Sequence, residues 1–141
     1  MKRVMVTTRI DAPIERVWRA LTVPAEVSIW DGVVPVEVRD DYPQPGHHAR
    51  WGSRLGPFRL TLHDHIRVVE PGACFAADID IAFVHVDETY RLRATEEGST
   101  ELVTDDLVTS RIPGLEWLAQ RLARANVNVS MNRLRDFCER S

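Results

Sequence analysis

Residues 58–69 read FRLTLHDHIRVV, and apolar residues alternate with polar ones along this stretch. A period of two predicts a β-strand, because successive side chains of a strand point to opposite faces of the sheet. One position breaks the apolar row, since Asp64 stands where another hydrophobic residue is expected. The stretch therefore predicts a strand that directs one carboxylate toward the otherwise apolar face of its sheet.

The same alternation recurs on both sides of this stretch and predicts an antiparallel sheet. We expect further strands near residues 4–10, 34–38, 48–54, 75–83, 84–94 and 100–110, most of them bounded by turns with proline or glycine. Residues 96–98, Glu-Glu-Gly, predict a three-residue hairpin loop, because glycine suits its left-handed position.

Three helices complete the predicted order of elements. Asp11-Ala12-Pro13 opens a first helix, and Pro24 to Trp30 predicts a second short one. Residues 115–138 predict a long closing helix whose apolar line shifts midway. Its first part comprises Leu115, Leu118, Leu122, Ala125 and Val129, and its shifted part comprises Val127, Met131, Leu134 and Cys138. Hairpin-linked strands and segregated helices are typical of an α+β fold, and a curved sheet under one helix leaves space for a pocket.

Composition and charge limit the classes of function. A chain of 141 residues predicts one domain spanning residues 1–141. A net charge of -3 argues against a nucleic-acid partner, which would need a basic face. Cys74 and Cys138 make no disulfide framework, and no stretch has the apolar length of a signal peptide or a membrane span. We therefore expect a cytoplasmic protein.

Several short motifs occur in an order that is typical of one superfamily. They are Ile10-Asp11-Ala12-Pro13 followed by Val17-Trp18, Leu21-Thr22 before Pro24, Trp30, Pro45-Gly46, Val69-Glu70-Pro71 and Pro113-Gly114. In these features the chain resembles the SRPBCC or helix-grip superfamily, which includes START domains, birch-pollen-type allergens and the polyketide cyclase/dehydrase group. The resemblance implies a helix-grip fold, with a curved antiparallel sheet of about seven strands wrapped around the long C-terminal helix. It also implies a cavity for a small hydrophobic molecule.

Two departures from the superfamily leave the chemistry open. The glycine-rich loop of the allergen-like branch is absent, since residues 42–46 contain one glycine. No motif matches the catalytic residues of characterised aromatase/cyclases one by one.

The turns give an estimate of which residues pair across the sheet. A tight turn at residues 70–73 places Asp64 opposite Ile79, and a reversal at Phe83-Val84 would place Ile79 near Glu88. The three-residue loop then pairs Glu88 with Asp106, whereas a loop of two or four residues would place Asp105 on the inner face instead. Three carboxylates are thus expected at one level of the concave face. Desolvation raises the pKa of such groups, and we name Asp64 and Glu88 as catalytic candidates.

Two structural alternatives compete with catalysis. Arg50, Arg121 or Arg124 would neutralise the carboxylates in a buried polar network, or a bulge would turn Asp64 outward. We rank the structural network first, a role in orienting a ligand second, and catalysis third, because a perturbed carboxylate marks a site only statistically.

Other side chains are expected to line the cavity. Trp30 and Trp51 are pocket candidates, Trp18 is expected in the core, and Trp117 is expected to cap the pocket or to contact a partner. With Asp64, Glu88 and Asp106, the predicted ligand-binding residues are Trp30, Trp51, Leu62, Phe75, Ile79, Ile81, Phe83, Tyr90, Leu92, Leu118 and Leu122.

No metal or cofactor is expected. His63 and His65 fall on the polar face of their strand, and no Cys/His cluster has zinc-site spacing. The chain has no phosphate-binding glycine loop, no dinucleotide fingerprint and no nucleophile motif.

Three functions remain in order of preference. The first is a carrier or binding module for a small hydrophobic or aromatic molecule. The second is a cofactor-free cyclase, dehydratase or isomerase that uses Asp64 or Glu88 for proton transfer, with Tyr90 or a tryptophan holding the substrate. The third is a protein-interaction module like the co-chaperone branch, with a filled interior. The protein is expected to be a monomer or a homodimer.

Overall fold

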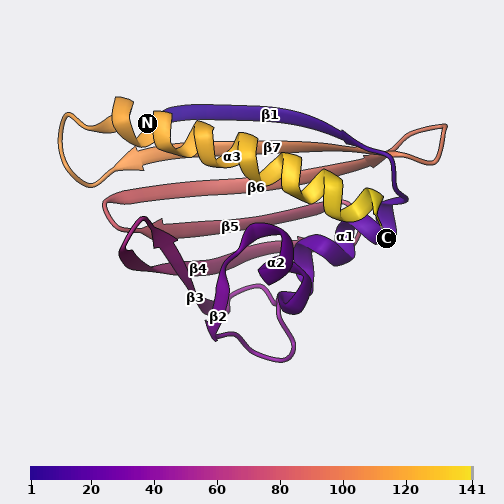
Figure 1. The fold of residues 1–141 in the computed structure, drawn as a ribbon, viewed down its shortest axis with the longest axis horizontal. Helices are drawn as coiled ribbons and strands as arrows, with labels where there is room; N and C mark the ends of the chain where they lie inside the picture. Colours follow the sequence, from indigo (N-terminus) through magenta and orange to yellow (C-terminus); the bar gives the residue numbers. More distant parts are fainter. Residues whose placement is uncertain (141) are drawn as a thin grey trace.

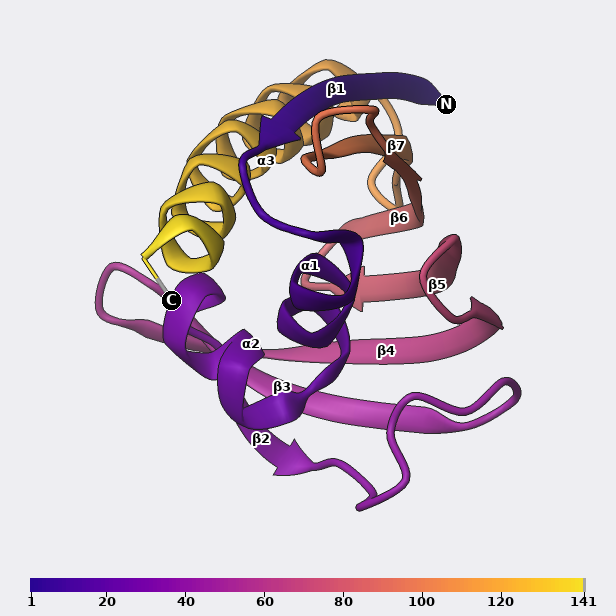
Figure 2. The same ribbon diagram turned by 90° about the vertical axis from the view of Figure 1, so that its right-hand side faces the viewer.

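The computed structural model describes residues 1–140, which form a seven-stranded antiparallel sheet and three helices. The strands lie in the order β1-β7-β6-β5-β4-β3-β2, and the sheet curves around the helices (Figures 1 and 2). The elements are β1 (Lys2–Ile10), α1 (Ile14–Thr22), α2 (Pro24–Asp31), β2 (Val34–Glu37), β3 (His48–Leu55), β4 (Phe58–Glu70), β5 (Cys74–Ile81), β6 (Val84–Ala94), β7 (Thr100–Ser110) and α3 (Glu116–Glu139). The predicted α+β helix-grip fold is confirmed.

Strand pairing confirms two of the three predicted neighbours of the acidic residues. Asp64 lies opposite Ile79, and Glu88 lies opposite Asp106. The predicted pairing of Ile79 with Glu88 is wrong, because β5 and β6 turn one residue earlier, at Ala82 and Phe83, and this places Val86 opposite Ile79. Ala82 adopts a φ of 51°, which a tight turn needs and the alternating pattern does not reveal.

A bulge in β4 changes which residues face the core beyond Asp64. The register with β5 shifts between Ile66 and Val68. Val69 therefore packs against the core, and Val68 does not continue the inward row as the alternation predicts.

Small side chains set the contact between α3 and the sheet. The helix packs on β1 and β7, at one side of the sheet, where Ala119 meets Val4 and Val108. In Figure 2 the rest of the concave face, over β4, β5 and β6, lies below α3 and opposite α1 and α2. Because α3 covers only part of the sheet, the two layers separate over the middle strands.

The predicted apolar line of α3 is correct only in its C-terminal half. The buried residues of the helix are Ala119, Val127, Ser130, Met131, Leu134 and Cys138. Leu122, Ala125 and Val129 are exposed. The close approach to β1 and β7 requires small residues, so Ala119 occupies the contact that the pattern assigns to leucines.

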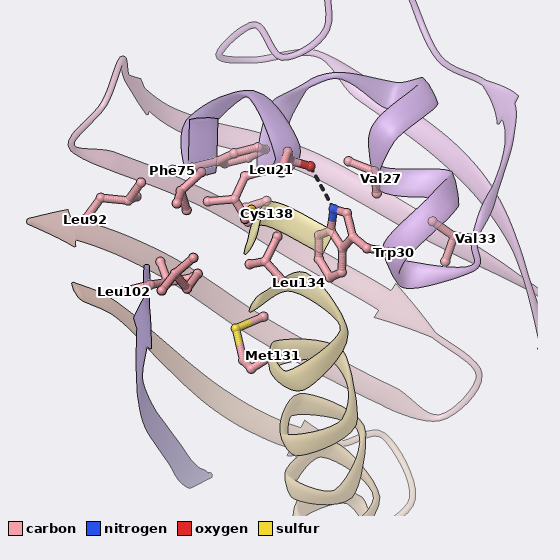
Figure 3. Packing of buried hydrophobic residues seen from close by; sticks show 14 of the residues in the cluster. Leu21, Val27, Trp30, Val33, Phe75, Leu92, Leu102, Met131, Leu134 and Cys138 are labelled. Atoms are coloured by element: carbon pink, nitrogen blue, oxygen red, sulfur yellow. Dashed lines mark hydrogen bonds between the residues drawn. The ribbon is translucent and has the colours of Figure 1, made fainter. Parts of the chain in front are cut away.

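The C-terminal half of α3 joins the main core, which Figure 3 shows at close range. Leu134 and Met131 pack there with Trp30 of α2, and Trp18 packs against the same cluster as predicted. The Trp30 indole N–H donates a hydrogen bond of 2.8 Å to the backbone oxygen of Ala20, which ties α2 to α1. This bond holds α2 at the edge of the open region.

Among the described helices, none has the length and apolar character that a membrane crossing requires.

We expect Leu134→Ala to destabilise the fold strongly. Leu134 is fully buried, so truncation removes apolar burial and leaves a cavity, at a cost of about 2 to 5 kcal/mol. Urea denaturation would measure the loss. Leu122→Ala on the same helix is the control, since Leu122 is 44% exposed and its truncation should cost less than about 1 kcal/mol. Equal losses would contradict the packing of α3 described above.

Candidate functional site: an acidic cavity under the long helix

Two adjoining chambers occupy the space between the sheet and the helices. The inner chamber, of about 70 Å³, lies beside α1 and α2, and the outer chamber, of about 320 Å³, lies between β3–β6 and α3. Both are lined by Trp30, Asp31, Val33, Leu62, Ile79, Glu88 and Tyr90. These shared residues make the two chambers parts of one cavity.

Most of the predicted ligand-binding residues lie around this cavity. Trp51, Asp64 and Phe75 line the inner chamber, in addition to the shared residues. The outer chamber is lined by Ile81, Phe83, Asp106 and Leu122, among others.

Leu92 and Leu118 lie elsewhere. Leu92 belongs to the core cluster, where it pairs with Leu102 of β7. Leu118 lines neither chamber, because Ala119, Leu122 and Ala123 form the side of α3 that faces the outer chamber. Trp117 is 55% exposed and lines neither chamber.

Asp64 is held inside the protein by two neutral hydrogen-bond donors. Its Oδ2 atom accepts bonds from the Tyr42 hydroxyl at 2.8 Å and from the Trp51 indole N–H at 3.3 Å. Its Oδ1 atom is buried without a partner. Burial raises the pKa of Asp64, and the bonds from Tyr42 and Trp51 oppose this shift. The Asp64 carboxyl group thus faces the inner chamber with hydrogen bonds to one of its two oxygen atoms and, within residues 1–140, no cation beside it.

The predicted arginine partners of Asp64 and its predicted outward turn are both wrong, although Asp64 does belong to a buried hydrogen-bond network. Arg50 instead binds Glu37 at 2.6 Å, and Arg121 and Arg124 are exposed on α3. The bulge in β4 comes after Asp64 and leaves that residue inward and 5% exposed. No salt bridge among the described residues involves Asp64.

Glu88 and Asp106 form a hydrogen-bonded pair of acids at the junction of the chambers. Tyr90 also donates to Glu88. Burial, and then the charge of Asp106, raises the pKa of Glu88 well above its usual range. Burial raises the pKa of Asp106 from 3.8 to about 6, while the bond from Glu88 opposes the shift. These shifts favour the protonated form of Glu88, which donates a hydrogen bond to the Asp106 carboxylate.

The neighbouring aspartate has the opposite environment. Asp105 faces the outer surface of the sheet, where it binds Arg3 at 3.0 Å and Arg91 at 3.5 Å. The three-residue loop thus places Asp106, and not Asp105, at the cavity.

Asp31 is a fourth cavity acid, and sequence analysis missed it. It is the last residue of α2, and its carboxylate accepts a hydrogen bond of 3.3 Å from Ser130 of α3. Burial raises its pKa, and Ser130 and Arg133 oppose the shift. The sequence contained one sign of its role. An acidic residue at the C-terminus of a helix is disfavoured by the helix dipole, so Asp31 at the end of the predicted second helix was unusual. Tyr42, also missed, reaches Asp64 from the loop between β2 and β3.

Three histidines lie close together on the outer surface of β3 and β4. His48 stacks on His65 with ring centroids 4.4 Å apart and lies 3.1 Å from His63 between ring nitrogens. Parallel rings do not converge on one ion, and the described residues contain no group of three or more ligands arranged to hold a metal.

Comparison with known proteins identifies the family. The sequence model for "Polyketide cyclase / dehydrase and lipid transport" matches residues 1–139, and the chain belongs to this family. Family membership suggests a ligand-binding or cyclase role. No curated protein matches the chain.

Solved structures share the fold at low sequence identity. A protein from Chromobacterium violaceum is 17% identical, with a TM-score of 0.79 and 99% of both chains covered. A protein from Arthrobacter aurescens is 12% identical, with a TM-score of 0.82, 99% of this chain and 87% of that chain covered. DynU16, a protein in the dynemicin biosynthetic locus, is 20% identical with a TM-score of 0.74, and this chain spans 48% of it.

We predict that Asp106→Asn changes the dependence of stability on pH. Because the folded state raises the pKa of Asp106 to about 6, it binds a proton more tightly than the unfolded chain does. The free energy of unfolding therefore falls between about pH 4 and pH 6, by on the order of 3 kcal/mol. The variant lacks this loss, so its stability relative to the wild type should increase with pH in urea denaturation.

Asp105→Asn is the matched control for this prediction. It removes the part-buried ion pairs to Arg3 and Arg91 on the outer face of the sheet, so it should cost about 1 to 3 kcal/mol and gain nothing as the pH rises. Parallel pH profiles for the two variants would contradict the buried position of Asp106.

Proposed function

We propose that the protein binds a small, mainly hydrophobic or aromatic molecule in the cavity between the sheet and α3. The observation that carries this proposal is the volume and lining of the outer chamber. At about 320 Å³ it lies at the lower end of the range for small-molecule sites. Its walls are mainly aliphatic and aromatic, with a few convergent polar groups, which is the usual composition of such a site.

The inner chamber extends the proposed site beyond Trp30. Its walls include Trp51, Phe75 and Tyr42, which pack edge to face or tilted against one another. Aromatic rings provide a large apolar contact area at low entropic cost, so a flat ring system fits this lining. The size of the cavity favours a molecule of one or two rings.

A size change on α3 tests the proposed site. Ala123 lines the outer chamber, so Ala123→Phe should fill part of it and weaken binding of the neutral probe 1-naphthalenemethanol about ten-fold or more. Isothermal titration calorimetry would measure the affinities. Ala125→Phe places the same side chain on the exposed side of the same helix and should leave binding unchanged. Equal affinities for the two variants would place the bound probe outside the cavity, contrary to the proposal. Native mass spectrometry of freshly purified protein would reveal a natural ligand.

A second candidate function, acid–base catalysis, is favoured by the pair of Glu88 and Asp106. A protonated Glu88 beside an Asp106 carboxylate provides a proton donor and a proton acceptor at one place. With a ketone in the outer chamber, Glu88 would protonate the carbonyl oxygen while Asp106 removes a proton from the adjacent carbon. The product is an enol, the intermediate of cyclisation, dehydration and isomerisation alike. Reversal returns both protons and restores the pair.

Hydrogen–deuterium exchange of a ketone tests this chemistry. We expect the wild type to accelerate exchange of the protons next to the carbonyl of 2-tetralone in deuterated buffer, as followed by proton NMR. Glu88→Gln removes the acidic proton and should slow the catalysed exchange at least about ten-fold. Asp105→Asn, outside the cavity, should exchange at the wild-type rate. Asp64→Asn should retain binding of 1-naphthalenemethanol, and slowed exchange in that variant would assign the proton transfer to Asp64. Wild-type exchange no faster than buffer alone would exclude this second function for the ketone.

The cavity argues against the third function considered from sequence. A filled interior was the feature expected of a protein-interaction module, and the outer chamber leaves the interior unfilled.

A further inference from the structure

Four carboxylates converge on the cavity from four different elements. Asp31 comes from α2, Asp64 from β4, Glu88 from β6 and Asp106 from β7. Among the described residues that line the chambers, Arg54 is the one cationic side chain, and it is solvent-exposed at the end of β3. The cavity therefore has an excess of acidic groups without a buried cation to balance them.

Two buried oxygen atoms in this group lack a hydrogen-bond donor. They are the Oδ1 atoms of Asp64 and Asp106, the latter when Glu88 is ionised and brings no proton to it. Their residues are 5% and 2% exposed, respectively, and line the inner and outer chambers. An unpaired buried acceptor costs about 1 to 3 kcal/mol, and folded proteins rarely leave one without a partner. A ligand with N–H groups would donate hydrogen bonds to these unpaired carboxylate oxygen atoms.

Two aromatic side chains line the cavity together with the acids. Trp30 and Tyr90 line both chambers together with Glu88. The faces of such rings attract a cation, and they do so more strongly in a desolvated site. The apolar walls of the outer chamber, such as Val86 and Met131, would contact the uncharged part of the same ligand.

We propose that the ligand is a small organic cation, an apolar or aromatic body that carries a protonated amine. The ammonium group would lie at the junction of the chambers among Asp31, Glu88 and Asp106, and the body would lie in the outer chamber. This inference rests on the proposed function and specifies the chemical class of the ligand.

Proton release provides a signature of this binding mode. Burial raises the pKa of each of the four cavity carboxyls. An ammonium ion favours the ionised carboxylate, so binding should release protons and should tighten as the pH rises through the titration of the acids. The other groups that face or influence these acids are Tyr42, Tyr90, Arg54 and Arg133, and, from the outer side of the sheet, His48, His65, Asp87 and Asp105.

Three probes of one size and different charge test the proposal. They are 1-naphthylmethylamine, 1-naphthalenemethanol and 1-naphthoic acid, titrated into the wild-type protein by calorimetry at about neutral pH. We expect the amine to bind about ten-fold or more tightly than the alcohol, since charge-assisted hydrogen bonds are stronger than neutral ones, and the acid to bind most weakly. Titration in two buffers with different ionisation enthalpies should reveal proton release for the amine and none for the alcohol.

Two variants test whether the preference for the amine over the alcohol depends on the pair of Glu88 and Asp106. Asp106→Asn should reduce the amine-to-alcohol affinity ratio toward one, whereas Asp105→Asn, the same change on the outer face, should preserve it. The comparison of probes on the wild type needs no variant, so a variant that fails to fold does not decide the outcome.

Each outcome has a defined meaning. If the alcohol or the acid binds as tightly as the amine, the cation proposal fails while the proposed binding function stands. If Asp106→Asn folds and keeps the full preference for the amine, the assignment to this cavity fails. If none of the three probes binds, the proposed function and the cation proposal both fail.

Discussion

The close contact of α3 with one side of the sheet determines the rest of the structure. Ala119 brings the helix onto β1 and β7, where Val4 and Val108 are fully buried. The helix then lies away from the middle strands, and α2, which is tied to α1, faces those strands across the cavity. The unfilled volume is therefore a consequence of where the helix makes its tightest contact, and it requires no exceptional sequence in the strands that line it.

The acids of the cavity accept hydrogen bonds from uncharged groups, and among them Asp31 is also stabilised by the nearby charge of Arg133. Tyr42 and Trp51 donate hydrogen bonds to Asp64, Tyr90 donates one to Glu88, and Ser130 donates one to Asp31. Such bonds meet part of the cost of burying a carboxyl group without cancelling its charge. An arginine in the same place would have neutralised the cavity and made it a structural element. Because uncharged donors do not cancel the charge of a carboxylate, the cavity keeps an acidic character.

Much of the fold and part of the site follow from local sequence patterns. The assumed tight turn at residues 70–73 and the length of the loop at residues 96–98 placed Asp64 opposite Ile79 and Glu88 opposite Asp106, the first of these with a bulge in β4 that the sequence did not predict. These predictions succeeded because period-two patterns and short loops fix the register of antiparallel neighbours. The position of Asp31 at the end of a helix marked it as unusual, but its place in the cavity depends on the packing of α2 against α3. Asp31 and its partner Ser130 are about a hundred residues apart in the sequence.

The failed predictions share one physical cause, which is that tertiary contact overrides local hydrophobicity. The turn at Ala82 and the bulge near Arg67 are backbone adjustments that do not interrupt the alternation of residue types. On α3 the pattern of leucines suggested the buried side, but a close helix–sheet approach selects Ala119.

Asp105 and Asp106 are consecutive residues with opposite environments, and the exposed hairpin between β6 and β7 decides which of them is interior. Surface hairpins usually accept insertions and deletions with little consequence. Here a change of one residue in loop length would place Asp105 in the cavity and Asp106 on the outer face. It would also turn all the other side chains of β7 to the opposite face of the sheet. The length of this loop is therefore constrained by the position of a cavity carboxylate far from it, and divergence among related proteins should spare its length more than its composition.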